Sequence, residues 1–255
     1  MKRAHSMVST NHPRYESLNR RDLLVEGYKS GIVSIHGLIA QGRGEAFDYL
    51  LGEKTSDTAR HATKVACAYL LTAKHPVISV NGNTAALVPK EIAELSYLTQ
   101  IPVEINLFHR SEDRIARIAE HLHAYGTENI LTGVDAVTLP KVASQRAAVD
   151  RRGIFQADTV FVPLEDGDRA GALVRSGKTV ISVDLNPLSR TAQASTVTIV
   201  DEVTRAMKNI NTSLRRFAEK DCFDELEDLK SSFDNRKNLD ASCRTLLRHL
   251  QSVVS

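Results

Sequence analysis

The chain of 255 residues has no tryptophan, few aromatic residues (5%) and a net charge of only +2. A nucleic-acid-binding protein usually has a basic field and aromatic side chains on which bases stack, so this composition argues against nucleic acid as a partner. The proportions of hydrophobic (42%) and charged (25%) residues are ordinary for a globular protein. The length suffices for one large α/β domain, alone or with a small appendage.

Long apolar runs are also missing. No uninterrupted apolar stretch approaches the ~18 residues that span a bilayer, and residues 1–20 contain no apolar core of the signal-peptide kind. We therefore expect a cytoplasmic protein without a membrane partner. Cysteine is scarce, since Cys67, Cys222 and Cys243 are widely spaced and form no CxxC pair, which argues against a disulfide framework or a zinc site. Cys67 is predicted to be a small buried hydrophobe in a helix.

What the chain does contain is an alternation of short β-rich runs with helical stretches. This pattern is typical of βαβ units and predicts an α/β fold, a Rossmann-like sandwich on a mainly parallel sheet. The predicted strands are 77–80, 103–107, 130–131, 159–163, 179–183 and 197–200.

Helical patterns flank this alternating region. Before the first strand lie roughly 70 residues of helical pattern, at 17–24, 47–51 and 59–71, which we expect to cover the sheet or to reach a partner subunit. We divide the chain into a Rossmann-like domain, 1–205, that includes this N-terminal layer, and a C-terminal helical extension, 206–255. The extension is expected to pack on its own sheet, with dimerisation as the alternative.

Two glycine-rich segments are rejected as nucleotide-binding loops. Residues 171–179 resemble a P-loop, but they have five residues between the glycines and lead from a helix into a strand, whereas a phosphate cradle needs strand, loop and then helix. The run Gly42-Arg43-Gly44 has Phe47 where the third glycine of a dinucleotide fingerprint belongs, so we expect no nicotinamide cofactor. The two glycines instead let the backbone approach a ligand while Arg43 reaches a phosphate.

The most informative polar cluster follows the strand 179–183. The carboxyl ends of strands in an open α/β sheet are where ligands bind, and this turn offers an acceptor for a ribose and donors for phosphates. The alternative is a solvated turn held by its own side chains. The polar residues of the turn are Asp184, Asn186, Ser189, Arg190 and Thr191.

Two further clusters also have a structural alternative. The segment 80–87 places Asn81 and Asn83 beside a helix start, where Asn83 or Thr84 is expected to cap the helix. The segment 163–170 contains three carboxylates that can hold magnesium through oxygen ligands or only satisfy a helix start. The three carboxylates are Glu165, Asp166 and Asp168.

The segment 104–110 places an amide, an imidazole and a guanidinium beyond one strand, on Asn106, His109 and Arg110. A lone histidine in such a place is more often structural. Because three polar groups of different chemistry occur together, we interpret this cluster as functional.

Read together, six motifs resemble the archaeal phosphopantothenate synthetase family, the 4-phosphopantoate–beta-alanine ligases. The motifs are HPRYESL, GLIAQGRGEAFDYLLGE, VISVNGNTAAL, EINLFHR, FVPLEDGDRAGAL and VDLNPLSRTA. They run from about residue 12 to about residue 205, so 206–255 lie outside the resemblance. The resemblance implies a Rossmann-like homodimer that uses ATP and Mg²⁺ to join 4-phosphopantoate to β-alanine. The products would be 4'-phosphopantothenate for coenzyme A synthesis, AMP and diphosphate, formed through an acyl-adenylate.

The resemblance also implies which residues contact ATP. These are Arg21, Arg43, Asp184, Leu185, Asn186, Arg190, Thr191, Glu202 and Val203. The sequence departs from the family pattern at 139–141, where a glycine is expected, and at Glu202, where asparagine is expected. An extra carboxylate beside ATP phosphates is unfavourable unless only its backbone makes contact.

Amide formation in water requires an activated carboxylate, and the charge that develops on the phosphates is best met by fixed cations. We expect a second basic site to bind the phosphate of 4-phosphopantoate. The clamp on ATP is predicted to be Arg21, Arg43 and Arg190. The second site is predicted to comprise Arg14, His109 and Arg110, with Asn81 and Asn83 bonding the hydroxyl or carboxylate of the substrate.

The amine of β-alanine must attack in its neutral form, so a base is needed. Imidazole has an ordinary pKa near ~6.5, which suits His109, but Glu104 or water can serve instead. The predicted catalytic residues are therefore His109, Asn81 and Arg110, and no metal ligand is assigned. Two other functions stay open at this point: a nucleotide-binding module without turnover, and another Rossmann-type enzyme.

Overall fold

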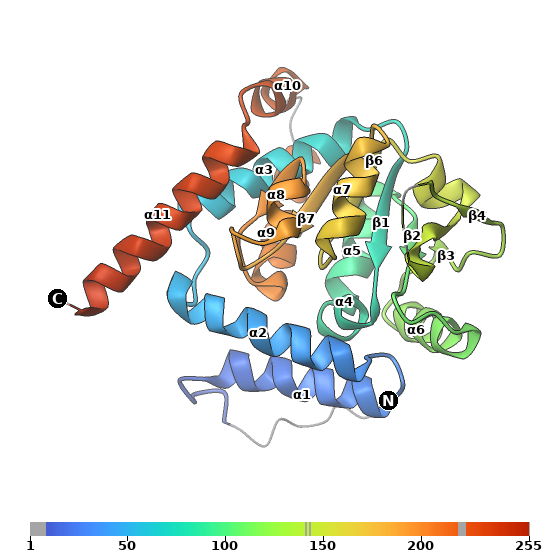
Figure 1. Cartoon of the computed structure of the whole chain (residues 1–255), viewed down its shortest axis with the longest axis horizontal. Helices are drawn as coiled ribbons and strands as arrows, with labels where there is room; N and C mark the ends of the chain where they lie inside the picture. The colour runs from blue at the N-terminus through green and yellow to red at the C-terminus, as the bar shows by residue number, and fades with distance from the viewer. Residues whose placement is uncertain (1–8, 141, 143, 219–222, 255) are drawn as a thin grey trace.

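A six-stranded parallel sheet organises the chain in the computed structural model, which describes residues 9–140, 142, 144–218 and 223–254 (Figure 1). Cys222 and residue 141, the last of the segment 139–141, lie outside the described residues. All five strand pairings in this sheet are parallel, so the predicted fold class is confirmed and each of the six predicted strands is present. Along the sheet the strands are β3 (Ile130–Leu131), β2 (Val103–Ile105), β1 (Pro76–Val80), β6 (Thr159–Val162), β7 (Thr179–Val183) and β8 (Val197–Ile199).

The strand order reverses between β1 and β6. From β1 the chain adds β2 and β3 on one side, and from β6 it adds β7 and β8 on the other. At such a point the two connections leave in opposite directions, which opens a crevice beyond the carboxyl ends of the two central strands. The topology therefore predicts where a ligand enters.

The hydrophobic core lies on both faces of the sheet. Alternate side chains of a strand point to opposite faces, so in β1 Ile78 and Val80 join the larger core while Val77 joins the smaller one. The larger core is covered by α3 (Asp57–Thr72), α5 (Pro89–Thr99) and α9 (Val203–Ala218), and the smaller by α7 (Gly167–Arg175). Because both faces are covered, the strands read as nearly continuous apolar runs.

The predicted helix boundaries at α6 (Glu112–Ala124) and α7 are present. The Ser111 side chain accepts the Arg114 N–H at 3.3 Å and caps α6, and Gly126 follows that helix with φ +99°. Gly177 follows α7 with φ +83°. The segment 171–179 thus runs from helix α7 into strand β7. This is the order of elements on which its rejection as a P-loop was based.

The predicted helical N-terminal layer consists of α1 (Tyr15–Lys29), α2 (Ile35–Leu51) and α3. α1 and α2 lie side by side at one end of the sheet, and both contact α4 (Gly82–Leu87), whereas α3 packs beside β8 (Figure 1). The run Gly42-Arg43-Gly44 lies within α2, and a Cβ added at Gly42 would meet no atom within 4 Å.

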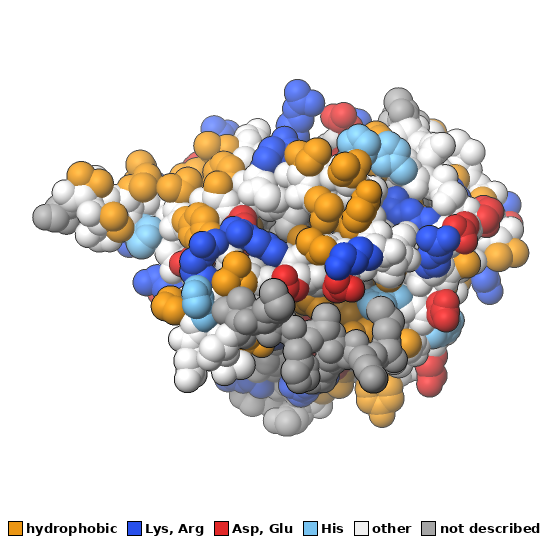
Figure 2. Space-filling view, turned by 90° about the horizontal axis from the view of Figure 1, so that it is seen from below, with side chains coloured by type: hydrophobic (Ala, Val, Ile, Leu, Met, Phe, Trp, Pro, Cys, Tyr) orange, Lys and Arg blue, Asp and Glu red, His pale blue; other side chains and the backbone are white. Residues whose placement is uncertain are grey.

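The C-terminal helices are α9, α10 (Phe223–Ser231) and α11 (Asn235–Val254). The predicted division after residue 205 falls inside α9, whose Ala206, Met207 and Ile210 are buried in the larger core. α11 packs against β8, α8 (Arg190–Ala194), α3 and α2, and its C-terminal end projects from the body with exposed Val253 and Val254 (Figures 1 and 2). Within the described ranges, no helix combines the length and apolarity that crossing a membrane requires.

A small antiparallel hairpin was not predicted. It pairs β4 (Ala136–Thr138) with β5 (Ala148–Asp150); η1 (Gln145–Ala147) lies between these two strands, and η2 (Arg151–Phe155) leads from β5 to β6. The strands have three residues each, too few to show a period in the sequence. The hairpin matters because it brings Arg146 to the centre of the molecule, where only 5% of that residue is exposed.

Candidate functional site

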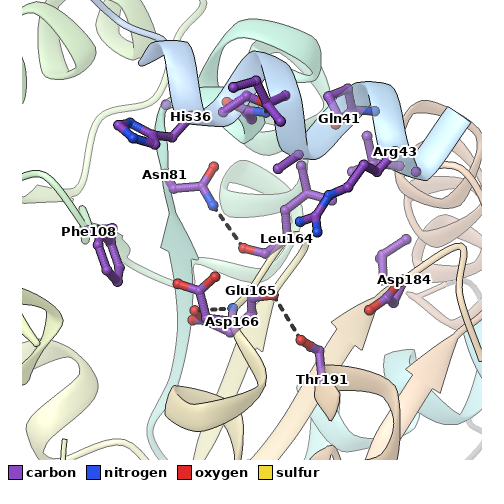
Figure 3. A pocket seen from close by; sticks show the side chains of 18 of the residues that line it. His36, Gln41, Arg43, Asn81, Phe108, Leu164, Glu165, Asp166, Asp184 and Thr191 are labelled. Carbon is purple, nitrogen blue, oxygen red and sulfur yellow. Dashed lines mark hydrogen bonds between the residues drawn. The ribbon is translucent and has the colours of Figure 1, made fainter. Parts of the chain in front are cut away.

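A cavity of about 810 Å³ opens where the topology predicts it, at the carboxyl ends of β1, β6 and β7 beneath α2. In Figure 3, Asn81 and Leu164 lie near its middle, His36 and Phe108 lie at one end, and Arg43 and Asp184 lie at the other. Its volume is in the range of ordinary ligand sites. We call the end with Arg43 and Asp184 the nucleotide end, after the ligand that the sequence predicts there, and the end with His36 and Phe108 the basic end.

The turn after β7 lines the nucleotide end and is also held by its own side chains. Asp184 Oδ1 accepts the Asn186 N–H at 2.9 Å, and the Ser189 hydroxyl donates to Asp184 Oδ2. Ser189 Oγ in turn accepts the Ala192 N–H at 2.9 Å and caps α8. Burial raises the pKa of Asp184 above its ordinary value. The alternative, a turn held by its own side chains, is therefore confirmed; the turn also lines the cavity, and its contact with a ligand stays a prediction.

Thr191 and Leu185 extend this wall. The Thr191 hydroxyl donates to the Glu165 carbonyl at 2.9 Å and so ties the turn after β7 to the end of β6 (Figure 3). Leu185 is 8% exposed and packs in a small apolar cluster beside Phe47, while Val203 lines the cavity at the start of α9. The nucleotide end thus combines an apolar wall with polar turn residues.

Asn81 joins the two central strands across the point where their order reverses. Its Nδ2 donates to the Leu164 carbonyl at 2.8 Å, and its Oδ1 accepts the Thr84 N–H at 3.0 Å, which caps α4 (Figure 3). The expectation that Asn83 or Thr84 caps this helix is therefore wrong. Asn83 instead donates to the Gly37 carbonyl at 2.8 Å and holds α2 over the cavity.

Some residues of the segment after β2 line the cavity, and others are buried or lie away from it. His109 lines the cavity, with its ring 4.8 Å from the His36 ring between centroids. Asn106 is buried and donates to the Ala148 carbonyl at 3.1 Å, so it holds the hairpin. Arg110 does not line the cavity; its Nη2 donates to the Thr132 carbonyl at 3.0 Å.

A cation-rich cluster of Arg146, Glu165 and Arg169 lies beside the basic end. The fully buried carboxylate of Glu165 accepts bonds from both guanidinium groups. Burial lowers the pKa of Arg146 and of Arg169 to about 10. Arg146 also lines the cavity, although nothing in its local sequence predicted a functional residue.

The three carboxylates of the segment 163–170 do not converge. Glu165 is ion-paired, Asp166 lies 3.4 Å from Arg146, and Asp168 is exposed near Arg190. Among the residues that the structure describes, no group of three or more His, Cys, Asp or Glu side chains is arranged to hold a metal ion. Of the three, Asp168 lies in the first turn of α7, while Asp166 is at the N-cap position without a capping hydrogen bond from its side chain.

An acid-rich cluster lies where α1 and α2 meet the start of α9. Asp48 accepts from Arg205 at 2.5 Å and from Arg20 at 3.2 Å, and Asp201 accepts from Arg205 at 2.9 Å. Glu202 Oε2 accepts the Thr204 N–H at 2.8 Å and lies 3.6 Å from Arg20, so its carboxylate caps α9 and does not line the cavity. We call Arg20, Asp48, Asp201, Glu202 and Arg205 the acid-rich cluster.

The three arginines predicted to clamp ATP are not all at the cavity. Arg43 lines it. Arg21 instead pairs with Glu45 at 2.8 Å and has a side chain 48% exposed, and Arg190 lies 3.9 Å from Asp168 with a side chain 87% exposed. In the described part of a single chain, Arg43 alone of the three is therefore positioned to contact a ligand in this cavity.

Comparison with known proteins assigns the chain to a family. A family model described as phosphopantothenate/pantothenate synthetase matches residues 58–249. The chain belongs to this family. The expected family is thus confirmed, and the match extends past residue 205, so most of the C-terminal helices that the motif resemblance left out belong to the matched region.

Several relatives carry the same name, 4-phosphopantoate–beta-alanine ligase. The protein from Methanosarcina mazei is 46% identical over 251 residues, which is 97% of each chain. The protein from Thermococcus onnurineus is 49% identical over 91% of this chain and 89% of its own. The protein from Methanospirillum hungatei is 52% identical over 80% of this chain and 83% of its own.

Proposed function

We propose that this chain joins 4-phosphopantoate to β-alanine through an amide bond, the reaction stated in the names of its relatives. The predicted ligase of coenzyme A biosynthesis is confirmed at this level by the family match and by those relatives. The observation that carries the proposal is the cavity itself, because a single crevice at the reversal of strand order has one end suited to a nucleotide and another suited to a second anion.

The nucleotide end fits ATP, the substrate that we propose supplies the free energy of amide formation. Arg43 is free to meet phosphate oxygens with paired donors, since no described residue forms a hydrogen bond or ion pair with its guanidinium. Leu185 and Phe47 present apolar surface to a base, and the Asp184 turn offers an acceptor to a ribose. Mg²⁺ fits as an ion held mainly by the phosphates, since the described residues form no carboxylate cage.

The amine of β-alanine loses a proton when it attacks. Glu104 was one candidate base, but it is 1% exposed, does not line the cavity, and accepts the N–H groups of Asp150 and Ile154 at 3.1 and 2.7 Å. This leaves His109, which lines the cavity, and water. The side chains of Arg110 and Asn81, both predicted to be catalytic, donate to the carbonyl groups of Thr132 and Leu164. They therefore support the proposal only by holding neighbouring segments in place.

A homodimer working in the cytoplasm remains part of the proposal. The projecting arm of α11 exposes Leu247 (58%), Val253 (70%) and Val254 (85%), an apolar surface that a second copy of the chain would cover. Arg21 and Arg190, which lie away from the cavity of their own chain, would then be available to a partner. Light scattering on the purified full chain measures the subunit number.

The test of the proposed function is product analysis. The full chain is incubated with ATP, Mg²⁺, 4-phosphopantoate and β-alanine, and the amide and the nucleotide products are measured by mass spectrometry. We expect the amide together with AMP and diphosphate. Formation of ADP and phosphate would replace an adenylate by an acyl phosphate, and ATP binding without any amide would favour a nucleotide-binding module without turnover.

A further inference from the structure

The basic end of the cavity holds four basic side chains, of which Arg146 pairs with Glu165 and Asp166 while Arg114 pairs with no described carboxylate. His36 comes from α2, His109 from the segment after β2, Arg114 from the first turn of α6 and Arg146 from the hairpin, and all four line the cavity. His36 and Phe108 lie on the side opposite to Arg43 and Asp184 in Figure 3. Segments far apart in the sequence thus place basic side chains at one end of a single cavity.

Arg114 has only neutral partners among the described residues. Its Nε donates to the Ile32 carbonyl at 2.9 Å and its Nη1 to the His109 carbonyl at 3.0 Å. Both bonds hold the guanidinium in place without neutralising it. Burial without a carboxylate lowers the pKa of Arg114. A fixed, partly buried guanidinium of this kind at a cavity is suited to an anionic ligand.

Arg146 adds a second cation, whose charge is only partly compensated. It shares the single buried carboxylate of Glu165 with Arg169, while the other nearby carboxylate, Asp166, has a side chain 57% exposed. Its Nε has no hydrogen-bond partner, although the residue is only 5% exposed. Repulsion from Arg114 helps to lower the pKa of Arg146, so the two guanidinium groups act on one region.

The histidines complete the basic end. Two imidazoles with centroids 4.8 Å apart offer ring nitrogens from two different elements. Two guanidinium groups and two imidazoles suit a dianionic phosphate better than a single carboxylate, because a phosphate presents three oxygens and about two negative charges. Phosphate therefore fits this end better than the carboxylate of β-alanine does.

We propose that Arg114 and Arg146, with His36 and His109, bind the phosphate of 4-phosphopantoate and set the preference for the phosphorylated hydroxy acid. This inference rests on the proposed function and replaces the predicted trio Arg14, His109 and Arg110, of which only His109 lines the cavity. The carboxylate of the same substrate then points along the cavity toward Arg43. In this arrangement His109 is a phosphate ligand, and the proton of the β-alanine amine passes to water.

The test compares steady-state kinetics of the full chain with an Arg114→Gln variant. KM for 4-phosphopantoate should rise about tenfold to a hundredfold, the loss expected for a charge-assisted hydrogen bond, while KM for ATP stays within about twofold. The ratio of kcat/KM for 4-phosphopantoate over that for pantoate should fall by a similar factor. Arg117→Gln is the matched control, because Arg117 lies on the same helix, is 49% exposed and pairs with Asp113.

A second variant keeps the inference testable if Arg114→Gln does not fold. His36→Gln removes only an exposed imidazole and should raise KM for 4-phosphopantoate about threefold to tenfold. A rise in KM for β-alanine instead, or an unchanged KM for 4-phosphopantoate in a folded variant, overturns the inference. A wild-type chain that forms no amide at all overturns the proposed function itself, so the two failures are distinguishable.

Discussion

The two buried ion clusters beside the cavity hold opposite surpluses of charge. The acid-rich cluster has three carboxylates, on Asp48, Asp201 and Glu202, for the two guanidinium groups of Arg20 and Arg205. In the cation-rich cluster, two buried guanidinium groups share one fully buried carboxylate, and the second carboxylate, Asp166, lies 3.4 Å from Arg146 and is 57% exposed. Both clusters join segments distant in sequence, but the acid-rich one joins three helices whereas the cation-rich one forms part of the cavity wall.

The difference lies in what compensates each surplus. The extra carboxylate of the acid-rich cluster meets the start of α9, where Glu202 accepts the N–H of Thr204 at 2.8 Å and the positive end of the helix dipole favours negative charge. In the cation-rich cluster the compensating group is the more exposed Asp166, 3.4 Å from Arg146, and the Nε atoms of Arg146 and Arg169 have no hydrogen-bond partner. We therefore expect the acid-rich cluster to serve stability, and we propose that Arg146, which lines the cavity, serves a ligand.

The largest effect is expected when the acid-rich cluster loses its central carboxylate. Asp48→Asn leaves Arg20 buried and Arg205 partly buried without their shared partner, which should lower the free energy of unfolding by about 3–5 kcal/mol. Urea denaturation measures this loss in the free energy of unfolding. Asp57→Asn removes the exposed partner of Arg60 and should change the free energy of unfolding by less than about 1 kcal/mol. Equal losses in the two variants would contradict a structural role for the cluster.

The free energy of unfolding should depend on pH through Glu104, a buried carboxyl group close enough to Arg169 for their charges to interact. Burial is the main cause that raises the pKa of Glu104 to about 7, against 4.5 in the unfolded chain. Between these values the folded protein holds the extra proton, so the free energy of unfolding falls as pH rises through this window, by up to about 3 kcal/mol. Denaturation at pH 5 and pH 8 measures the fall, and Glu104→Gln should flatten it. If the free energy of unfolding of Glu104→Gln falls with pH as steeply as that of the wild type, another group is responsible for the fall.

At the nucleotide end, Arg43→Ala should lower kcat about a hundredfold, the usual loss when a fixed donor to a developing charge is removed. Diphosphate release measures this rate. Arg21→Ala separates two models of the site, because Arg21 is ion-paired with Glu45 outside the cavity of its own chain. A single-chain site predicts a small effect for Arg21→Ala, and an effect as large as that of Arg43→Ala would require a second subunit to complete the site.

The smallest effects concern the glycines of α2. Gly42→Ala fills open space in a helix and should stabilise the protein by up to about 1 kcal/mol with unchanged activity. Gly37→Ala would collide with the Asn83 side-chain oxygen and disturb the bond that Asn83 donates to the Gly37 carbonyl. It should therefore destabilise the protein. Loss of activity in Gly42→Ala would restore the expectation that this glycine lets the backbone approach a ligand.

The parallel sheet could be predicted from the residues alone, since apolar runs bounded by turns require strands covered on both faces, and so could helix ends such as Ser111 and Gly126, through local bonding and backbone freedom. The local pattern also marked Asp184, directly after β7, and His109, four residues after β2, as candidate site residues, and both line the cavity. Contacts between separate elements placed Arg146, Arg114 and His36 at the same cavity. Their function depends on which charges face one another across separate elements, and no local pattern encodes whether a guanidinium meets a carboxylate, a carbonyl or an open cavity.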